Sequence, residues 1–374
     1  MIRGNDGGPN PPIGRPHAGD GASGPVGDAE AMPGIAGADA TPDIGGADVL
    51  PGSAGVDAPP RPGTFSLEGR AVPGLYLVGW VAGLMGAGVL FVSFQATVSG
   101  AAPWLFLLGL VLLGLGLFAG AGSQAVERGR RSDLAYRGPS PVLVFLLVVV
   151  ATFVALIVVL APLSALGLDA RSPAATTLNL LLTTALYVGV IQVLVVGPGA
   201  LSWREMGVVR PGAAEVRDLL VGALFALPVL VVTLVLGGVM SRFLEPAPSQ
   251  LPDAVDAAGL VANLVTAAIL APVGEEIFFR GFATTAWART SGARAAIVRG
   301  ALFFAIAHVV TLFDADFALG AQRALFSFVA LLPVAVTLGW LFLGRRSLYA
   351  AIGLHAAFNA IQVLALAAAG AATG

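Results

Sequence analysis

From Leu75 onward the sequence is a succession of apolar runs of about 20 residues, the length at which a helix crosses the hydrocarbon core of a bilayer. Inside lipid every backbone N–H and C=O must be satisfied within the chain, and helices do this within one segment. Only 11% of the 374 residues are charged, against about 25% in soluble domains, which is too few to cover a water-facing surface. The sequence therefore predicts an all-α fold, a polytopic membrane helical bundle.

We expect about nine transmembrane helices. They lie near residues 75–98, 103–121, 141–163, 177–197, 219–241, 258–287, 296–313, 324–343 and 348–370. In the first two, Gly79 with Gly83 and Gly116 with Gly120 form small-xxx-small pairs, which let helix backbones approach closely. We interpret these pairs as packing features without chemistry.

Residues 1–73 differ in kind from the rest of the chain. They are rich in Gly, Pro, Ala and Asp and show neither helical nor strand periodicity. Such a segment cannot bury enough apolar area to offset its conformational entropy, so we predict a disordered tail. No apolar h-region follows the start, which argues against a signal peptide.

The charged residues exclude several classes of protein and predict an orientation. Every basic residue is Arg, and the net charge of −2 excludes a basic nucleic-acid-binding domain. The absence of Cys excludes disulfides, thiolate zinc sites and a Cys nucleophile. Arginines gather in alternate loops, before the first, third, fifth, seventh and ninth spans, which predicts a cytoplasmic tail and an outer C-terminus. The Arg-only, Ala/Gly/Pro-rich composition is typical of a high-GC bacterium, so we expect a multi-pass protein of its plasma membrane.

Ionisable side chains within the spans concentrate in three of them. A charge at bilayer depth costs about 2.5–3.5 kcal/mol on the insertion scale, so such residues by default indicate a functional site. The sixth, seventh and ninth spans hold Glu275, Glu276, Arg280, His308 and His355, together with the polar Asn359.

The spacing within each span brings these residues onto shared helix faces. Glu276 with Arg280, Phe304 with His308, and His355 with Asn359 are i,i+4 pairs. Glu275 lies about 100° around the helix from Glu276, so one carboxylate can be ion-paired while the other faces a cavity. From the estimated span ends we expect Glu275, His308 and His355 to meet in one cavity between mid-membrane and the cytoplasmic face.

Each pair also has a purely structural interpretation. Glu276 and Arg280 alone would more often form a structural ion pair. His308 alone would be a hydrogen-bonding partner between helices, and His355 with Asn359 could simply join two helices. The coincidence of all of them in a chain that otherwise excludes such groups favours a functional site.

The same residues resemble a known family. The segment 275–281, Glu-Glu-Ile-Phe-Phe-Arg-Gly, is similar to the E-E-x-x-x-R motif of the CPBP family, which comprises intramembrane proteases related to type II CAAX prenyl endopeptidases and to bacteriocin self-immunity (Abi) proteins. Phe304–His308 resembles its F-x-x-x-H motif, and His355–Asn359 its H-x-x-x-N motif. The resemblance covers about residues 217–365. It suggests a division into a tail (1–73), accessory helices (74–200) and a protease core (201–370).

The resemblance implies hydrolysis of a peptide bond inside the membrane. Glu275 would be the general base on water, assisted by His308, while His355 and Asn359 would stabilise the oxyanion. Glu276, Arg280 and Phe304 would support the site. The substrate would be a membrane-embedded or lipid-anchored peptide or protein, in contact with the lipid bilayer, and no nucleic acid would be involved.

The cofactor and the activity stay open at this point. Glu275, His308 and His355 could form a three-ligand zinc site with an open position, and the family is often described as metalloproteases. No H-E-x-x-H pair is present, however, and family members also fit a glutamate-dependent scheme without metal, which we favour. The alternatives are a non-hydrolytic immunity or scaffold protein of the same family and a proton-linked transporter, for which no internal repeat is visible.

Overall fold

The computed structural model describes residues 63–97, 103–169, 172–247, 256–310, 312, 314 and 316–373. All regular elements among these residues are helices, which confirms the predicted all-α membrane bundle. Most of the predicted disordered tail, residues 1–62, lies outside the described residues.

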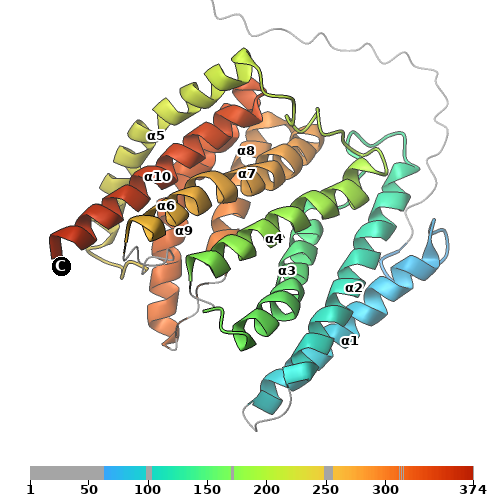
Figure 1. Cartoon of the computed structure of the whole chain (residues 1–374). Coiled ribbons are helices and arrows are strands. Elements are labelled where there is room, and N and C mark those ends of the chain that lie inside the picture. The colour runs from blue at the N-terminus through green and yellow to red at the C-terminus, as the bar shows by residue number, and fades with distance from the viewer. Residues whose placement is uncertain are drawn as a thin grey trace, which may run out of the picture. The chain divides into compact units, whose positions relative to one another are not determined.

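The helices follow one another along the chain (Figure 1). The elements are α1 (Pro73–Thr97), α2 (Pro103–Gly129), α3 (Pro141–Ala165), α4 (Pro173–Ile191), the π-helix η1 (Gln192–Val196), α5 (Ala213–Met240), α6 (Ala257–Val265), the π-helix η2 (Thr266–Leu270), α7 (Ala271–Glu276), the π-helix η3 (Ile277–Thr284), α8 (Thr285–Val309), α9 (Phe317–Arg345) and α10 (Leu348–Thr373). Helices α1 to α4 each begin with Pro, whose fixed φ suits the first helical turn and whose missing N–H is not needed there.

Within the described residues, eight segments are long and apolar enough to cross a membrane, against the nine predicted. The sixth, Ala257–Val309, has 53 residues. At 1.5 Å per residue one straight helix of this length would span about 80 Å, far beyond a core of about 30 Å. Gly292 breaks the helix with φ 78° and ψ 166°. A Cβ at Gly300 would lie 2.8 Å from the Thr284 hydroxyl oxygen, so the chain folds back at Gly292. The predicted sixth and seventh spans are therefore the two arms of one helical hairpin.

Helices α1 and α2 form the first hairpin along the chain, with close backbone packing, and the hairpin that turns at Gly292 is the second. A Cβ at Gly79 would lie 3.0 Å from the Gly120 nitrogen, and one at Gly116 would lie 2.3 Å from the Gly83 nitrogen. Side chains at these positions would hold the backbones apart. The predicted packing role is confirmed at Gly79 and Gly116, whereas a Cβ at Gly83 or Gly120 would meet nothing within 4 Å.

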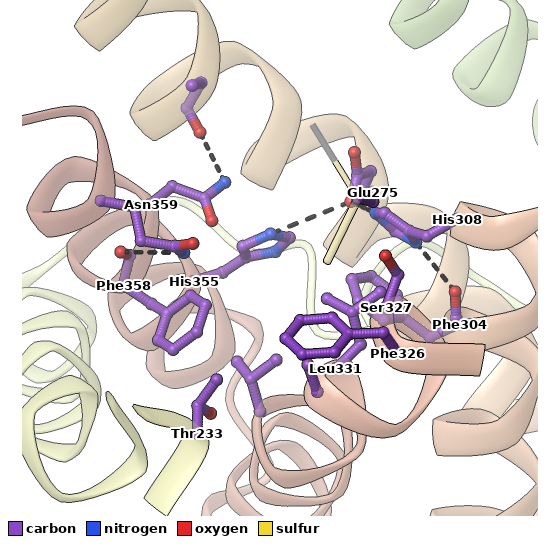
Figure 2. Close-up of a pocket in the computed structure, with 15 residues that line it drawn as sticks. Thr233, Glu275, Phe304, His308, Phe326, Ser327, Leu331, His355, Phe358 and Asn359 are labelled. Carbon is purple, nitrogen blue, oxygen red and sulfur yellow. Dashed lines mark hydrogen bonds and ion pairs between the residues drawn. The ribbon is translucent and has the colours of Figure 1, made fainter. Parts of the chain in front are cut away.

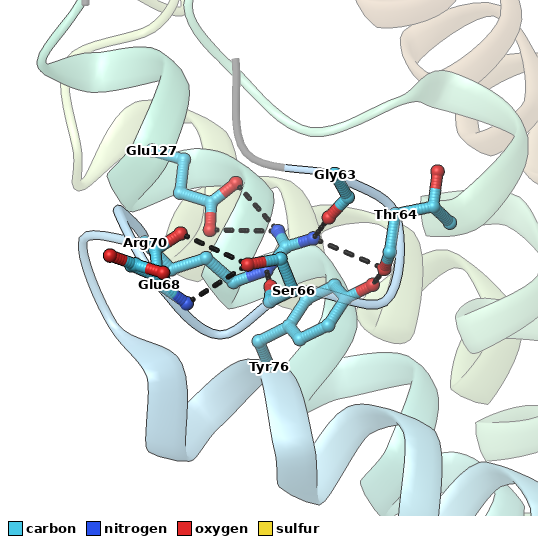
Figure 3. Close-up of polar contacts among 7 residues, drawn as sticks. All are labelled: Gly63, Thr64, Ser66, Glu68, Arg70, Tyr76 and Glu127. Atoms are coloured by element: carbon cyan, nitrogen blue, oxygen red, sulfur yellow. Dashed lines mark hydrogen bonds and ion pairs between the residues drawn. The ribbon is translucent and has the colours of Figure 1, made fainter. Parts of the chain in front are cut away.

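The segment before α1 is held by Arg70 (Figure 3). Its Nε donates to the Ser66 carbonyl (2.6 Å), and one terminal nitrogen donates to the carbonyls of Gly63 (2.9 Å) and Thr64 (3.2 Å). The other terminal nitrogen donates to both carboxylate oxygens of Glu127 on α2, at 3.1 and 3.3 Å. Residues 63–72, which the sequence analysis assigned to the tail, are thus tied to the first hairpin.

Contacts between loops and helix ends define the two ends of the bundle. At one end, Asp218 near the start of α5 pairs with Arg345 at the end of α9, and Glu205 in loop 197–212 pairs with Arg289 at 2.6 Å. The backbone N–H of Ser202 and this Arg289 pair lower the pKa of Glu205 to about 2. We call this the arginine-rich end. At the opposite end, the Glu245 N–H, after α5, donates to the Gln322 side chain near the start of α9 at 3.4 Å. Helices α5 and α9 are therefore antiparallel.

Candidate active site

Two π-helices flank the acidic pair. Helix α7, which contains Glu275 and Glu276, lies between η2 and η3. Pro272 at its start has no N–H to donate to the preceding turn, which favours the wider π turn before it. In η3 the Thr284 hydroxyl donates to the Phe279 carbonyl five residues earlier, at 2.8 Å. Single π turns inside α-helices occur frequently at functional sites.

Glu276 forms a buried ion pair, as the spacing predicts. Its Oε1 accepts from Arg280 at 2.9 Å, and the two side chains are 0% and 1% exposed. Arg280 also donates to the Ala335 carbonyl on α9 at 3.3 Å and lies 4.3 Å from the centre of the Phe304 ring. The same Glu276 oxygen accepts from His355 Nδ1 at 2.8 Å, a contact that the sequence did not predict.

Glu275 points toward His308 and His355 (Figure 2), whereas Glu276 pairs with Arg280, so the two carboxylates diverge as expected. Its Oε2 lies 3.5 Å from His308 Nε2 and 3.9 Å from His355 Nε2. This oxygen is buried and accepts no hydrogen bond from the residues that the structure describes. Glu275, His308 and His355, which come from three separate predicted spans, therefore meet at one point.

The hydrogen bonds of the two histidines fix their tautomers. His308 Nδ1 lies 2.8 Å from the Phe304 carbonyl oxygen, and His355 Nδ1 faces the Glu276 carboxylate. Because these oxygens only accept, each Nδ1 carries a hydrogen, and in the neutral rings each Nε2 has a lone pair directed toward Glu275. With both rings neutral, three acceptor atoms converge, and a bound donor such as a water molecule, or a cation, would satisfy them. A protonated histidine would instead donate from Nε2 to Glu275.

The convergence point lies in a cavity of about 350 Å³. Figure 2 shows the side chains that surround it. The lining residues are Thr233, Ala247, Ala267, Glu275, Phe304, His308, Phe326, Ser327, Ala330, Leu331, Val334, His355, Phe358, Asn359 and Gln362.

Asn359 also lines the cavity but has a second partner. Its Nδ2 donates to the Ala267 carbonyl on η2 at 2.8 Å. This bond joins α10 to η2, as in the structural interpretation of the residue. An amide carries two N–H groups, so the second stays available to the cavity.

The cavity extends from the convergence point along α9 and toward the loop after α5. Its lining includes Ala247, in the loop after α5, and Phe326 and Ser327, in the first half of α9. These residues lie toward the end opposite the arginine-rich one. The expected depth, between mid-membrane and the cytoplasmic face, stays a prediction.

The donor set has the chemistry of a zinc site, but its geometry does not match one. Two His and one Glu are a typical catalytic zinc set, and zinc-bound His usually donates its other N–H to an oxygen, as both do here. Within the described ranges, no group of three or more His, Cys, Asp or Glu is arranged to hold a metal ion. Glu275, His308 and His355 would have to draw closer together to form such a site.

Several lining residues were not found by the sequence analysis. Thr233, Ser327 and Gln362 contribute polar atoms, while Phe326 and Phe358 contribute aromatic rings. A search for any polar side chain in the otherwise apolar eighth and ninth spans would have found Ser327 and Gln362. The phenylalanines carry no such signal, because many of the chain's 20 Phe residues lie in spans.

Comparison with known proteins supports the same family. No curated protein and no solved structure matches the chain. Every predicted site residue, from Glu275 to Asn359, lies within residues 257–361, and this segment matches a family model. The family is described as type II CAAX prenyl endopeptidase Rce1-like, a family of proteases, and the resemblance inferred from the three motifs is thereby confirmed.

Proposed function

We propose that this protein is an intramembrane endopeptidase that hydrolyses a peptide bond of a membrane-associated substrate. The observation that carries the proposal is the convergence of Glu275 Oε2 with Nε2 of His308, at 3.5 Å, in a cavity of about 350 Å³. With His308 neutral, both atoms accept hydrogen bonds, and a water molecule beside them in the cavity would donate to each. Such a water is oriented and polarised for attack on a carbonyl.

The proposed reaction needs a base that takes a proton from water, a route for this proton to the leaving nitrogen, and a site that stabilises the oxyanion. Glu275 takes a proton from water while the water oxygen bonds to the scissile carbonyl carbon. The resulting tetrahedral intermediate collapses as the C–N bond breaks, and the proton passes from Glu275, through His308, to the leaving nitrogen. The products are a carboxylic acid and an amine, and Glu275 is again a carboxylate.

His355 and Asn359 lie on the opposite side of the proposed water from the α8 arm. Asn359 can donate its second N–H to the developing oxyanion. His355 can donate from Nε2 only as an imidazolium, because its Nδ1 hydrogen is directed to Glu276. In this proposal Glu276 and Arg280 position His355 and do not touch the substrate.

A metal ion would be bound by the same three residues. Glu275, His308 and His355 would hold it, and when bound it would polarise the water and the carbonyl as a Lewis acid. Metal analysis of the purified protein, and cleavage before and after dialysis against a chelator, test this directly. Cleavage that survives complete removal of metal supports the glutamate-dependent scheme, and loss restored by zinc supports the metal scheme.

The proposed setting is the plasma membrane of a bacterium. The eight apolar segments make the protein multi-pass. The substrate would be a membrane-embedded or lipid-anchored peptide or protein in the same bilayer.

The test compares wild type with Glu275→Gln in nanodiscs containing a detergent-extracted bacterial membrane proteome. New peptide N-termini are counted by mass spectrometry. The isosteric amide keeps the packing but removes the base, so the new termini should disappear. Glu68→Gln is the matched control, because Glu68 is exposed and lies outside the cavity. Identical cleavage by Glu275→Gln would contradict the proposal, as would a wild type that moves protons across liposomes and produces no new termini.

A further inference from the structure

The cavity is closed toward the arginine-rich end. On that side of Glu275 and His355, η3, α9 and α10 each contribute a buried side chain. Arg280 is 1% exposed, and Leu338 and Leu354 are 0% exposed. The buried Glu276–Arg280 ion pair lies on the same side of the cavity.

The cavity is lined in the other direction by half-buried residues. Thr233 lies in the last third of α5, Ser327 in the first half of α9, and Ala247 in the loop after α5. Along the hairpin, Glu275 and His308 lie about 25 Å from Gly292 at 1.5 Å per residue. Arg289 and Arg299 near this turn lie at the arginine-rich end, so counted from them the site is about 14–21 Å deep, near the middle of a hydrocarbon core of about 30 Å.

The two ends differ strongly in arginine. Loop arginines in bacterial membrane proteins face the cytoplasm. At the opposite end the described residues include only Arg242 and Arg323, and Arg323 is paired with Asp314 at 2.5 Å. The other arginines of the described loops and helix ends lie at the arginine-rich end: Arg70, Arg128, Arg130, Arg131, Arg137, Arg204, Arg210, Arg217, Arg289, Arg294, Arg299, Arg345 and Arg346.

We infer that the cavity opens toward the extracytoplasmic side of the membrane and that the scissile segment of the substrate enters from there. The sidedness rests on the burial and the arginine pattern alone. The statement about the substrate also rests on the proposed function.

The lining restricts the chemistry of the entering segment. Among the lining residues that the structure describes there is no Arg or Lys, and Glu275 contributes a carboxylate. A free C-terminal carboxylate would find no cation to pair with except the two histidines. The phenyl rings of Phe326 and Phe358 and the polar groups of Thr233, Ser327 and Gln362 suit an uncharged, partly apolar internal segment. The substrate class is therefore an exported or membrane-spanning protein cleaved near its outer end, and a cytoplasmic C-terminal tail does not fit.

The experiment uses the absence of native Cys. Three full-length single-Cys variants are expressed in bacteria and treated as intact spheroplasts with a membrane-impermeant methanethiosulfonate reagent. Phe317→Cys marks the start of α9, where the side chain is 89% exposed. Ser327→Cys marks the cavity, and Ser132→Cys marks an exposed position in the loop at the arginine-rich end. None of these residues belongs to the proposed catalytic set.

We expect Phe317→Cys and Ser327→Cys to be modified in intact spheroplasts, and Ser132→Cys only after the membrane is permeabilised. The reverse pattern would overturn the inference. So would a Ser327→Cys that stays unmodified while Phe317→Cys reacts, because the cavity would then be closed on this side. Labelling requires no peptidase activity, so this result and the test of the proposed function can fail independently.

Discussion

The two helical hairpins of this bundle are held together by different means. In α1–α2 the glycine backbones touch, and the ion pair between Arg70 and Glu127 lies at the hairpin's end. In the hairpin that turns at Gly292, phenyl rings pack together and the ion pair between Glu276 and Arg280 lies in the interior. Glycine packing joins membrane helices without burying charge. An interior ion pair costs desolvation energy, so its presence indicates that the second hairpin serves more than assembly.

The largest expected effect comes from breaking the interior pair. Arg280→Ala leaves the carboxylate of Glu276 buried without its cation, at a cost of about 3–5 kcal/mol. The midpoint temperature of thermal unfolding in detergent should therefore fall sharply, or the protein should fail to fold. The double variant Glu276→Gln/Arg280→Met removes both charges and keeps an acceptor for His355, so it should recover most of the stability. A stable but inactive Arg280→Ala would instead place Arg280 in contact with the substrate.

The next effect separates the two roles of Asn359. Loss of an oxyanion donor lowers kcat by about 10²–10³ and changes KM little. Loss of a bond between helices, here the one to the Ala267 carbonyl, lowers stability by about 0.6–2 kcal/mol and leaves kcat of the folded fraction unchanged. We expect Asn359→Ala to show the first pattern, with a smaller drop in stability. Steady-state kinetics beside thermal unfolding distinguish the two outcomes.

Disrupting the glycine hairpin should affect stability and spare the chemistry. Gly116→Val places a side chain where even a Cβ would lie 2.3 Å from the Gly83 nitrogen. We expect a loss of about 1–3 kcal/mol, the usual range for overpacking. Cleavage per folded molecule should stay unchanged, because none of the cavity lining comes from α1 or α2. Gly88→Val is the control, since a Cβ at Gly88 meets nothing within 4 Å.

The sequence predicts contacts within a helix better than contacts between helices. The i,i+4 rule gives the Glu276–Arg280 pair, and the 100° offset gives the separate direction of Glu275. The bond from His355 to Glu276 joins residues 79 positions apart, and neither residue type specifies that partner. Asn359 donates to a backbone carbonyl, which has no signature in the sequence. The direction in which the cavity extends depends on which buried side chains close its other side. Because the apolar spans are similar in composition, the sequence does not show which side of the cavity is open.

The smallest expected effect comes from Arg70. Arg70→Ala removes the Glu127 pair and the bonds to three carbonyls of residues 63–66, all near the end of the first hairpin. The Arg70 side chain is only 7% exposed, but Glu127 is 25% exposed and the other partners lie at the end of the hairpin, so water can reach them once Arg70 is removed and we expect a loss of about 1 kcal/mol. Hydrogen exchange should therefore rise in residues 63–72, while the unfolding temperature changes little and cleavage stays the same. Arg130→Ala, at an exposed position of the same end, is the control and should change neither hydrogen exchange nor cleavage.

A fall in cleavage for Arg70→Ala alone would show that the two hairpins are coupled. The contrast between the two hairpins would then be wrong. In that contrast, the ion pair at the end of the first hairpin only holds a loop in place, and the ion pair inside the second hairpin positions the residues of the site.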